Sequence, residues 1–408
     1  MDAATTESGA HGPRPRPRRV EIAENASELF SSRGFHAVRM EDIAEASGIT
    51  ARALYRHYAN KQALLAHVVR EDQQHVIETL TALTEQPADE RGLDASLTAL
   101  TNTALDSRQL SLLWQREARH LDADDYRLVR RQTRWIAEKF EALLIDSERD
   151  DLNEAAADIR SWVVVSIVSG PGLYASTLSR PRLAQDLIAA SKRVINEPAA
   201  VAADEPPNNE VHRISISRRE QLIYAAARAF RDKGFGGVSI DDIGGQLGIV
   251  GPALYRYFDN KADILVATVN RLQEWLALEM TRAMRTRCPD EEVLAHLVQG
   301  YVRIALEETD LLAVSLTERL YLPATVSERI DRVQADYITE WQRWLSVARP
   351  DLSEARAATL VKTAKTVIDD CVRIPHLRQY QDFPAELTHA ALATLGLQLR
   401  SPAVAESA

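Results

Sequence analysis

The sequence predicts an all-α protein made of two tandem copies of one helical module. Residues 18–69 recur as residues 218–269 without a gap, so that Gly34 reappears as Gly234, and matches continue at the same interval to residues 154 and 354. Apolar residues follow a helical period throughout, and the alternating pattern of a β-strand does not occur. A repeat of 200 residues is long enough for each copy to bury its own core.

The composition predicts a globular protein of the cytoplasm. Apolar residues make up 45% of the chain and charged residues 26%. The most apolar stretch, residues 162–168, is far shorter than a membrane span needs, and the N-terminus lacks the apolar core of a signal peptide. Cys288 and Cys371 are too few for a disulfide framework and lack the paired spacing of a zinc site, so we expect packing roles and no metal or cofactor.

The chain begins with a segment that predicts a disordered basic arm, residues 1–17. It is small and polar and then alternates Pro with Arg14 and Arg16. Such an arm is either a solvated tail or a segment that lies on the backbone or minor groove of DNA.

The first predicted helix begins at Arg18 and ends at Gly34, and its counterpart ends at Gly234. One face carries apolar residues at i, i+4, i+7 and i+8, namely Ile22, Ala26, Leu29 and Phe30.

Two short helices joined by a tight turn come next, which is the pattern of a helix-turn-helix. Residues 41–47 form the first, Gly48 permits the left-handed turn, and Thr50 can cap a second helix that starts at Ala51. Leu54 and Tyr58 face inward by their spacing. The residues left for the major groove of DNA and its phosphates are Arg52, Tyr55, Arg56 and His57.

Lys61 lies in the first turn of the following helix, where a cation opposes the helix dipole. An anion at that point would be held by both the free N–H groups and the ammonium. We therefore expect a DNA phosphate beside Lys61 and beside Lys261, which occupies the same place, although a solvated lysine is the alternative. Their removal should then flatten the salt dependence of DNA binding by about one unit each.

The second head differs from the first at its reading helix. Val250 cannot cap, and Gly251-Pro252 replace Ala51-Arg52, although Pro252 suits a first helical turn. Asp259 also offsets its positive charge. We expect the two heads to read different half-sites, with the first supplying more of the affinity.

Beyond each head the pattern stays helical, with about nine helices per copy. We expect a helix-turn-helix domain over 18–65, a helical regulatory domain over 66–196, a linker over 197–212, a second helix-turn-helix domain over 213–265 and a second regulatory domain over 266–400. The linker is Pro/Ala-rich, acidic and aperiodic.

The net charge of −10 is unevenly distributed. Residues 11–61 and 211–261 each carry three more basic than acidic side chains, which leaves −16 on the remainder. Two basic heads on acidic bodies suit contact with phosphates, because the local field governs that contact.

The segments ITARALYRHYANKQALL (49–65) and IVGPALYRYFDNKADIL (249–265) resemble the signature of the TetR family. The resemblance implies that the short third helix of each head enters the major groove of double-stranded promoter DNA. It also implies that phosphates are held by Tyr55, His57 and Lys61 in one head and by Tyr255, Tyr257 and Lys261 in the other, beside Arg256. Thr50 matches the capping residue of the family.

The same resemblance implies that the bodies pair through their last two helices. Residues 162–168 are apolar on every face, and the counterpart in copy two is rich in small residues such as Ala357 and Ala364. We therefore expect a monomeric pseudo-dimer of two TetR-like modules, each a three-helix head on a helical body. A swapped homodimer is the alternative.

A small-molecule pocket in each body, whose occupancy changes the separation of the heads, is also implied. For any single residue an aromatic core or a solvated charge is the plain alternative. The candidate lining residues are Trp114, Glu117, His120, Tyr126, Trp135, Trp162 and Tyr174 in copy one, and Tyr301, Glu318, Tyr321, Trp341 and Asp369 in copy two. Residues 169–172 (SGPG) interrupt the copy-one helix and either open a pocket or bend the helix.

Together with LLWQREARHL (112–121), the tandem layout resembles mycobacterial two-domain TetR repressors of mammalian-cell-entry lipid-transport operons. This implies a repressor of lipid or sterol transport or metabolism genes, with a lipid or an acyl or steroid thioester as effector. The alternative is a DNA-binding regulator controlled by a partner protein. No catalytic residues are expected, because the spacings of a nucleophile elbow, a phosphate loop or a metal site are missing and Asp124-Asp125 point about 100° apart on a helix.

Overall fold

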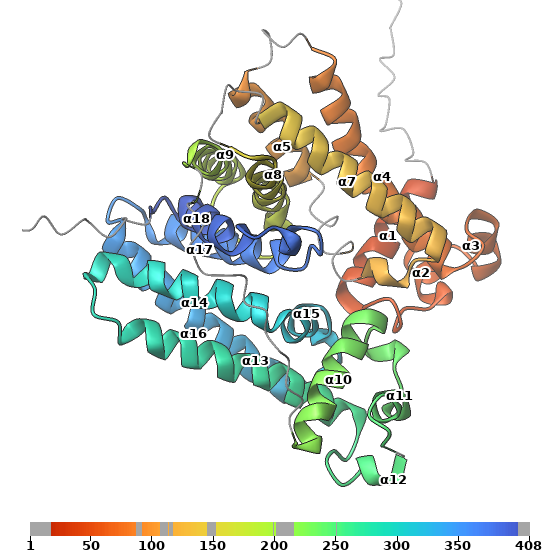
Figure 1. Ribbon diagram of the computed structural model, residues 1–408. Helices are drawn as coiled ribbons and strands as arrows, with labels where there is room; N and C mark the ends of the chain where they lie inside the picture. Colours follow the sequence, from red (N-terminus) through yellow and green to blue (C-terminus); the bar gives the residue numbers. More distant parts are fainter. Residues whose placement is uncertain are drawn as a thin grey trace, which may run out of the picture.

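The computed structural model describes residues 18–86, 92–106, 113, 117–144, 152–198, 200, 216–249 and 251–398, and within them every regular element is helical. Two three-helix heads lie at one end of the molecule and the bodies fill the other (Figure 1). The heads are α1 (Arg18–Arg33), α2 (Met40–Ala46) and α3 (Ala51–His57), and α10 (Arg218–Lys233), α11 (Ile240–Gly245) and α12 (Gly251–Leu254). The predicted basic arm, Trp114, Val250 and nearly all of the predicted linker lie outside the described residues.

The local signals of the first head act as expected. Gly48 has a positive φ of 63°, which lets the chain turn sharply between α2 and α3. The Thr50 hydroxyl accepts a hydrogen bond from Ala53 N at 3.2 Å, and Asn60 caps the next helix in the same way. Ile22, Ala26 and Phe30 of the predicted stripe are fully buried in a core that also takes residues from the body, and Leu29 is partly buried against it.

The bodies are built from longer helices. The first contains α4 (Lys61–Thr84), α5 (Leu93–Asp106), α7 (Ala123–Leu144), α8 (Glu154–Ser169) and α9 (Arg180–Asn196). The second contains α13 (Lys261–Met284), α14 (Val293–Glu307), α15 (Thr309–Thr317), α16 (Ala324–Ala348), α17 (Glu354–Cys371) and α18 (Phe383–Leu395). The described part of copy two thus holds nine α-helices, as the sequence predicts.

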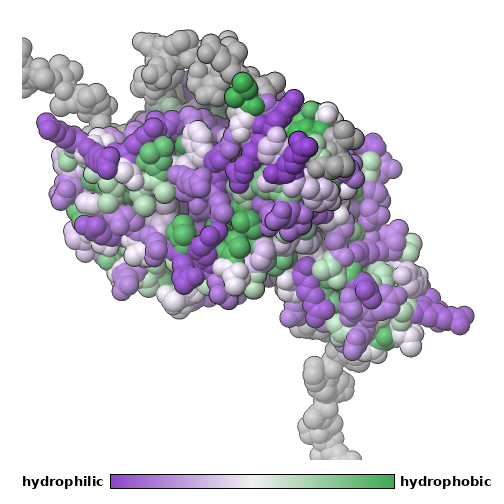
Figure 2. Space-filling model, turned by 90° about the horizontal axis from the view of Figure 1, so that it is seen from below, coloured by the Kyte–Doolittle hydropathy of each residue, from purple (hydrophilic) through white to green (hydrophobic). Residues whose placement is uncertain are grey.

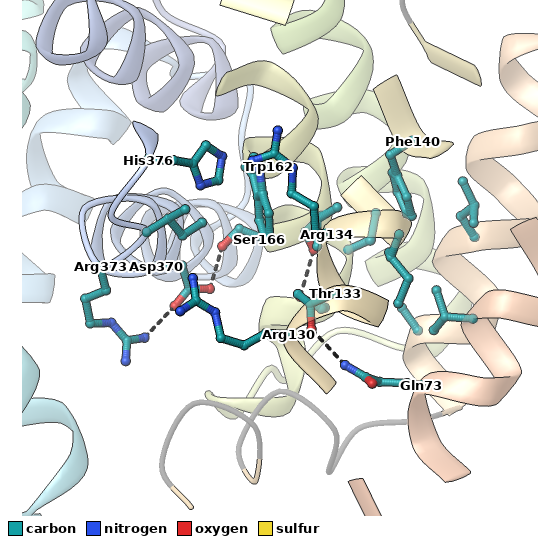
Figure 3. Close-up of a pocket in the computed structure, with 18 of the residues that line it drawn as sticks. Gln73, Arg130, Thr133, Arg134, Phe140, Trp162, Ser166, Asp370, Arg373 and His376 are labelled. Atoms are coloured by element: carbon teal, nitrogen blue, oxygen red, sulfur yellow. Dashed lines mark hydrogen bonds and ion pairs between the residues drawn. The ribbon is translucent and has the colours of Figure 1, made fainter. Parts of the chain in front are cut away.

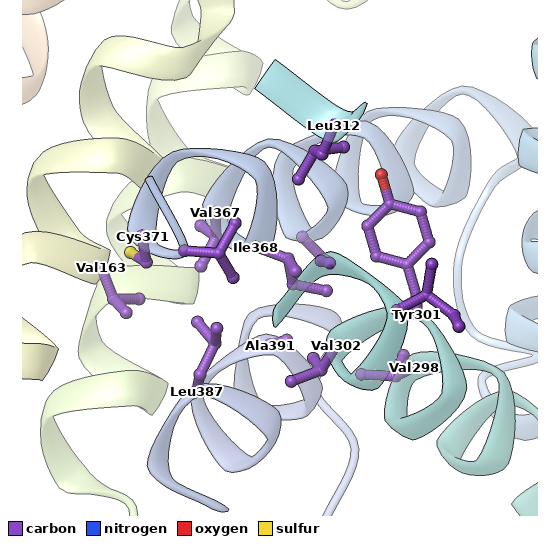
Figure 4. Packing of buried hydrophobic residues seen from close by; sticks show 14 of the residues in the cluster. Val163, Val298, Tyr301, Val302, Leu312, Val367, Ile368, Cys371, Leu387 and Ala391 are labelled. Carbon is purple, nitrogen blue, oxygen red and sulfur yellow. The ribbon is translucent and has the colours of Figure 1, made fainter. Parts of the chain in front are cut away.

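The two modules pair inside one chain through α8 and α9 of the first and α17 and α18 of the second. Val163 lies beside Cys371 and Leu387 in a continuous apolar core (Figure 4). Polar contacts also cross the seam. The Arg160 guanidinium binds the Glu386 carboxylate at 3.1 Å, although both side chains are only 2% exposed. This arrangement is the pseudo-dimer that the sequence predicts.

The interruption after α8 brings the modules close together. A 3-10 turn, η2 (Gly170–Gly172), follows α8, whereas α17 continues to Cys371. A Cβ on Gly170 would lie only 3.1 Å from Cγ2 of Thr366, so the glycine allows α17 to approach.

Hydrophilic side chains dominate the face of the molecule in Figure 2, with smaller apolar areas between them. In the described part of the chain, no helix combines the length and the apolar character needed to cross a membrane.

Candidate DNA-binding heads and a cavity between the modules

Helix α3 presents the outward face that the sequence predicts. The Leu54 side chain is fully buried, which fixes the rotation of the helix. Tyr55 is 49% exposed, and Arg52, Arg56 and His57 are also exposed. Two guanidinium groups, a phenol and an imidazole therefore lie together on a surface that can meet phosphates and base edges.

Helix α12 is shorter than α3. It covers a single turn that includes Pro252, and Leu254 anchors it in the core. Tyr255 and Tyr257 are 53% and 39% exposed, and Arg256 is exposed beside them. The two heads thus offer different surfaces, as the prediction of unequal half-sites requires.

The ammonium of Lys61 is bound inside its own head. It donates hydrogen bonds to the carbonyl oxygens of Phe35 at 2.5 Å and Val38 at 2.7 Å, and it lies 4.2 Å from the centre of the Phe35 ring. Burial lowers the pKa of Lys61. Lys261 makes the same contacts with Phe235 and Val238. An ammonium has three N–H donors, and each lysine uses two of them to hold the loop of its head. The phosphate contacts themselves stay a prediction.

Four expected pocket residues, two in each copy, instead join the heads to their bodies. In copy one the Glu117 carboxylate accepts a hydrogen bond from Phe35 N at 3.1 Å, and the His120 ring stacks on the Phe35 ring at 5.0 Å. Burial is the main cause that lowers the pKa of His120 to about 3. Glu117 and His120 do not line the cavity described below, because the Glu117 carboxylate and the His120 ring contact Phe35 of the head.

Copy two repeats this junction. Glu318, which is completely buried, accepts a hydrogen bond from Phe235 N at 2.9 Å, and the Tyr321 ring stacks on Phe235 at 5.1 Å. Glu318 and Tyr321 likewise belong to the junction and not to a pocket.

The two junctions interlock. Arg119 of copy one forms an ion pair with Glu318 and donates a hydrogen bond to Thr317 at 3.1 Å. A Cβ on Gly236 of the second head would lie 2.7 Å from Cδ2 of His36 in the first head, so the two heads approach each other closely at this point. The junctions of the two copies therefore form one contiguous contact region between the heads and the bodies.

A cavity of about 500 Å³ lies in the first body, where the second module closes it. Its walls come from α4, α5, α7 and α8 and, across the seam, from the end of α17 and the residues after it (Figure 3). The apolar part of the wall is formed by Val76, Leu100, Ala104, Ile136, Phe140, Trp162, Val165 and Val168. Trp162 is thus on a cavity, as the sequence predicts, and so is Tyr126.

Polar groups gather on the other side of the same cavity. Arg130 and Arg134 come from α7, and Arg373 and His376 come from the second module. Asp370 accepts a hydrogen bond from Ser166 at 2.6 Å across the seam and binds Arg373 at 3.0 Å. In the part of the chain that the structure describes, the buried Trp162 Nε1 and Gln73 Oε1 have no hydrogen-bond partner.

The remaining candidates do not line this cavity. Tyr174 donates or accepts a hydrogen bond with Thr363 at 2.7 Å in the seam, and Trp135 packs beside the core under the Lys139 ammonium. In copy two, Tyr301 donates a hydrogen bond to Asp369 at 2.6 Å, and Trp341 is buried against it. Tyr301 and Trp341 are buried in the second body, where a pocket was expected, and the space beside them is only about 10 Å³.

The sequence analysis did not predict that Arg130 and Arg134 line a pocket, although their spacing places them on one face of a helix. Tyr126, Arg130 and Arg134 follow each other at i, i+4 and i+8, which places them on one face of α7. That the face looks into a cavity depends on the other module. Among the residues that the structure describes, no three His, Cys, Asp or Glu side chains are grouped to hold a metal ion.

Residues 22–68 and residues 222–268 both match the family model described as bacterial regulatory proteins, tetR family. The chain is 28% identical to the HTH-type transcriptional repressor KstR2 of Rhodococcus jostii (strain RHA1) over 109 residues, which are 26% of this chain and 53% of that protein. It is 30% identical to the HTH-type transcriptional activator FasR of Mycolicibacterium smegmatis over 84 residues, which are 21% of this chain and 38% of that protein.

The match therefore spans about half or less of these curated relatives. Among solved structures, the ketosteroid transcriptional regulator KstR2 of Mycobacterium tuberculosis aligns with a TM-score of 0.38 and 19% identity, covering 47% of this chain and all of that one. The two family matches coincide with the two helical heads, so each head of this chain is similar to the helix-turn-helix domain of the tetR family, and that domain occurs twice.

Proposed function

We propose that the chain is a sequence-specific transcriptional regulator that binds double-stranded promoter DNA with two non-identical heads on one polypeptide. The observation that carries this proposal is the pair of exposed reading helices, α3 and α12, at one end of a seam that ties their bodies together. Because both modules are on one chain, the second head is always present at a high effective concentration, and the chain can bind two half-sites of the DNA without dimerisation.

We further propose that it acts as a ligand-responsive repressor of lipid or sterol transport or metabolism genes. The largely apolar cavity next to the seam supports a hydrophobic effector. A route from that cavity to the junctions runs along α4, because this helix carries Gln73 and Val76 of the cavity wall and also Gln62, whose side chain donates a hydrogen bond to the carbonyl oxygen of His120 at 3.1 Å.

The test is direct binding to a labelled fragment from upstream of its own gene, measured by fluorescence anisotropy across a salt series. We expect tight binding that weakens with salt, and weaker binding for Arg56→Ala at all sequences. The matched control is Arg127→Ala, which removes an exposed arginine of the body that pairs with Asp124. Absence of salt-dependent binding, or equal losses in both variants, contradicts the proposal.

The repressor assignment needs a second measurement. Transcription from the bound promoter should fall when the protein is added and recover when an effector is supplied. If lipid-loaded and delipidated protein bind DNA equally well, control by a partner protein replaces control by a ligand.

A further inference from the structure

We infer that the chain has one effector site and not two, and that this site takes an amphipathic anion whose apolar part lies in the first module. The inference rests on the proposed function and adds to it the number of ligands and their chemical class.

The second body contains the counterpart of the cavity, but it is filled. Gln73, Val76 and Val165 line the first cavity, and the residues 200 positions later, Gln273, Leu276 and Lys365, line a space of only about 10 Å³. The same place in the fold therefore exists twice, with about 500 Å³ in one copy and no room for a ligand in the other.

Three side chains explain the difference. Tyr301, Lys365 and Asp369 occupy positions where the first copy has the smaller Thr101, Val165 and Ser169. The Tyr301 hydroxyl donates to Asp369 at 2.6 Å, and the Lys365 ammonium donates to the same carboxylate at 2.6 Å.

Tyr301 and Asp369 of this network are buried and Lys365 is partly buried, and Tyr337 and Trp341 pack against the Tyr301 ring. A ligand could enter the second body only by breaking these contacts, which costs more than entry into a preformed cavity. The second module thus contributes a wall to the cavity of the first module and has no equivalent cavity of its own.

The chemistry of the first cavity indicates what it binds. Its volume is in the range of pockets that enclose a small molecule, and its inner wall is aliphatic and aromatic. Three arginines and one carboxylate, Asp370, stand on the polar side, so that side favours a negative group.

The arginines are not equivalent. Arg134 is paired with Glu138 at 3.1 Å, and Arg373 is paired with Asp370 at 3.0 Å. Arg130 has no carboxylate partner among the residues that the structure describes; it lies 5.9 Å from the Tyr126 ring. The unpaired Trp162 Nε1 donor lines the same cavity. We therefore assign Arg130 to the anionic end of the ligand, where a carboxylate or a phosphate can accept its hydrogen bonds.

The experiment counts bound ligands by native mass spectrometry and measures their affinity by calorimetry on the full chain. The probes are dodecanoate, hexadecanoate and deoxycholate, with dodecanol as the uncharged match of the first. We expect one bound anion per chain. The wild type should bind dodecanol at least tenfold more weakly than dodecanoate, and Arg130→Ala should bind dodecanoate at least tenfold more weakly than the wild type does. Arg131→Ala is the matched control, since this exposed arginine is next in sequence but does not line the cavity. Its affinity should equal that of the wild type.

A filled variant, Ala104→Phe, should lose the ligand while it keeps its helical content and its affinity for promoter DNA. Two bound anions per chain, no binding of any of the three acids, equal binding of dodecanol, or an unaltered Arg130→Ala variant would each overturn the inference. DNA binding is measured on the same preparations. If the protein binds DNA but does not bind one anion per chain, only the ligand site is disproved. If it binds one anion but no DNA, the proposed function is disproved.

Discussion

Replacement of Arg160 by alanine should be among the most damaging single changes in this molecule. The Arg160 guanidinium donates to both carboxylate oxygens of Glu386 and to the carbonyl oxygens of Glu197 and Pro198. Ala200 N donates to the same carboxylate at 2.7 Å. The pair joins α8 of one module to α18 of the other, and both side chains are 2% exposed.

The expected cost follows from what remains after the change. Glu386 would keep a buried negative charge with a single backbone donor, and two carbonyl oxygens would lose their partner. Breaking one side of a buried ion pair costs about 3–5 kcal/mol, which is a large part of the ~5–15 kcal/mol that stabilises a typical domain. Replacing both partners by apolar residues, as in Arg160→Met with Glu386→Leu, should restore the part of the loss that comes from the unpaired Glu386 charge.

Urea unfolding followed by tryptophan fluorescence and circular dichroism measures these differences. The matched control is Arg127→Ala, which removes an exposed ion pair with Asp124 and should change the free energy of unfolding by less than about 1 kcal/mol. If Arg160→Ala costs no more than this control, or if the double variant is as unstable as the single one, the pair is solvated and the reasoning fails.

Three further predictions concern assembly, the lysines and pH. The mass in solution measured by light scattering should be 45.5 kDa, and a value twice as large would show the swapped homodimer instead of a pseudo-dimer. Lys61→Met should lower the melting temperature of the first head because two loop carbonyl oxygens lose their donor; if stability is unchanged and only the salt slope of DNA binding flattens by about one unit, the phosphate role dominates. Burial, together with the charges of Arg119, His36 and Lys61, lowers the pKa of His120 to about 3. The Glu117 carboxylate lies 3.7 Å from the ring nitrogen of His120. The His120 side chain binds a proton near pH 6.5 in the unfolded chain but not in the folded chain. Its contribution to the free energy of unfolding is therefore complete above pH 6.5 and is lost as the pH falls toward 3. The loss is about 2 kcal/mol at pH 5. His120→Phe should keep the stacking on Phe35 and show a smaller drop in melting temperature between pH 7 and pH 5; an equal drop would contradict this account.

The architecture of the heads could be predicted because its signals are local. Gly48 and Thr50 act within four residues of their own positions, and the burial of Leu54 and Tyr58 follows from the period of a helix. The repeat carried these inferences to the second head, except for the cap, because Val250 replaces Thr50. The resemblance to the TetR family, together with the apolar residues 162–168, indicated the helices that pair.

The role of Lys61 shows where local reasoning stopped. Its position in a first helical turn suggested an anion nearby, and the structure supplies two carbonyl oxygens from a loop more than 20 residues earlier. Glu117 and Glu318 were misplaced for the same reason, since their partners lie 82 and 83 residues away. A carboxylate in a helix gives no sign of whether it faces a ligand or a backbone N–H of another domain.

Residue order alone thus determined the class of fold, the duplication and the outward faces of the reading helices, because each depends on periodicity, caps and turns over a few positions. Only the tertiary structure decided that one body is hollow and the other filled. That difference comes from the volumes of Tyr301, Lys365 and Asp369 set against those of Thr101, Val165 and Ser169, and from a wall contributed by the opposite module. Space between helices is a sum over side chains from distant parts of the chain, so it becomes visible only when they are packed together.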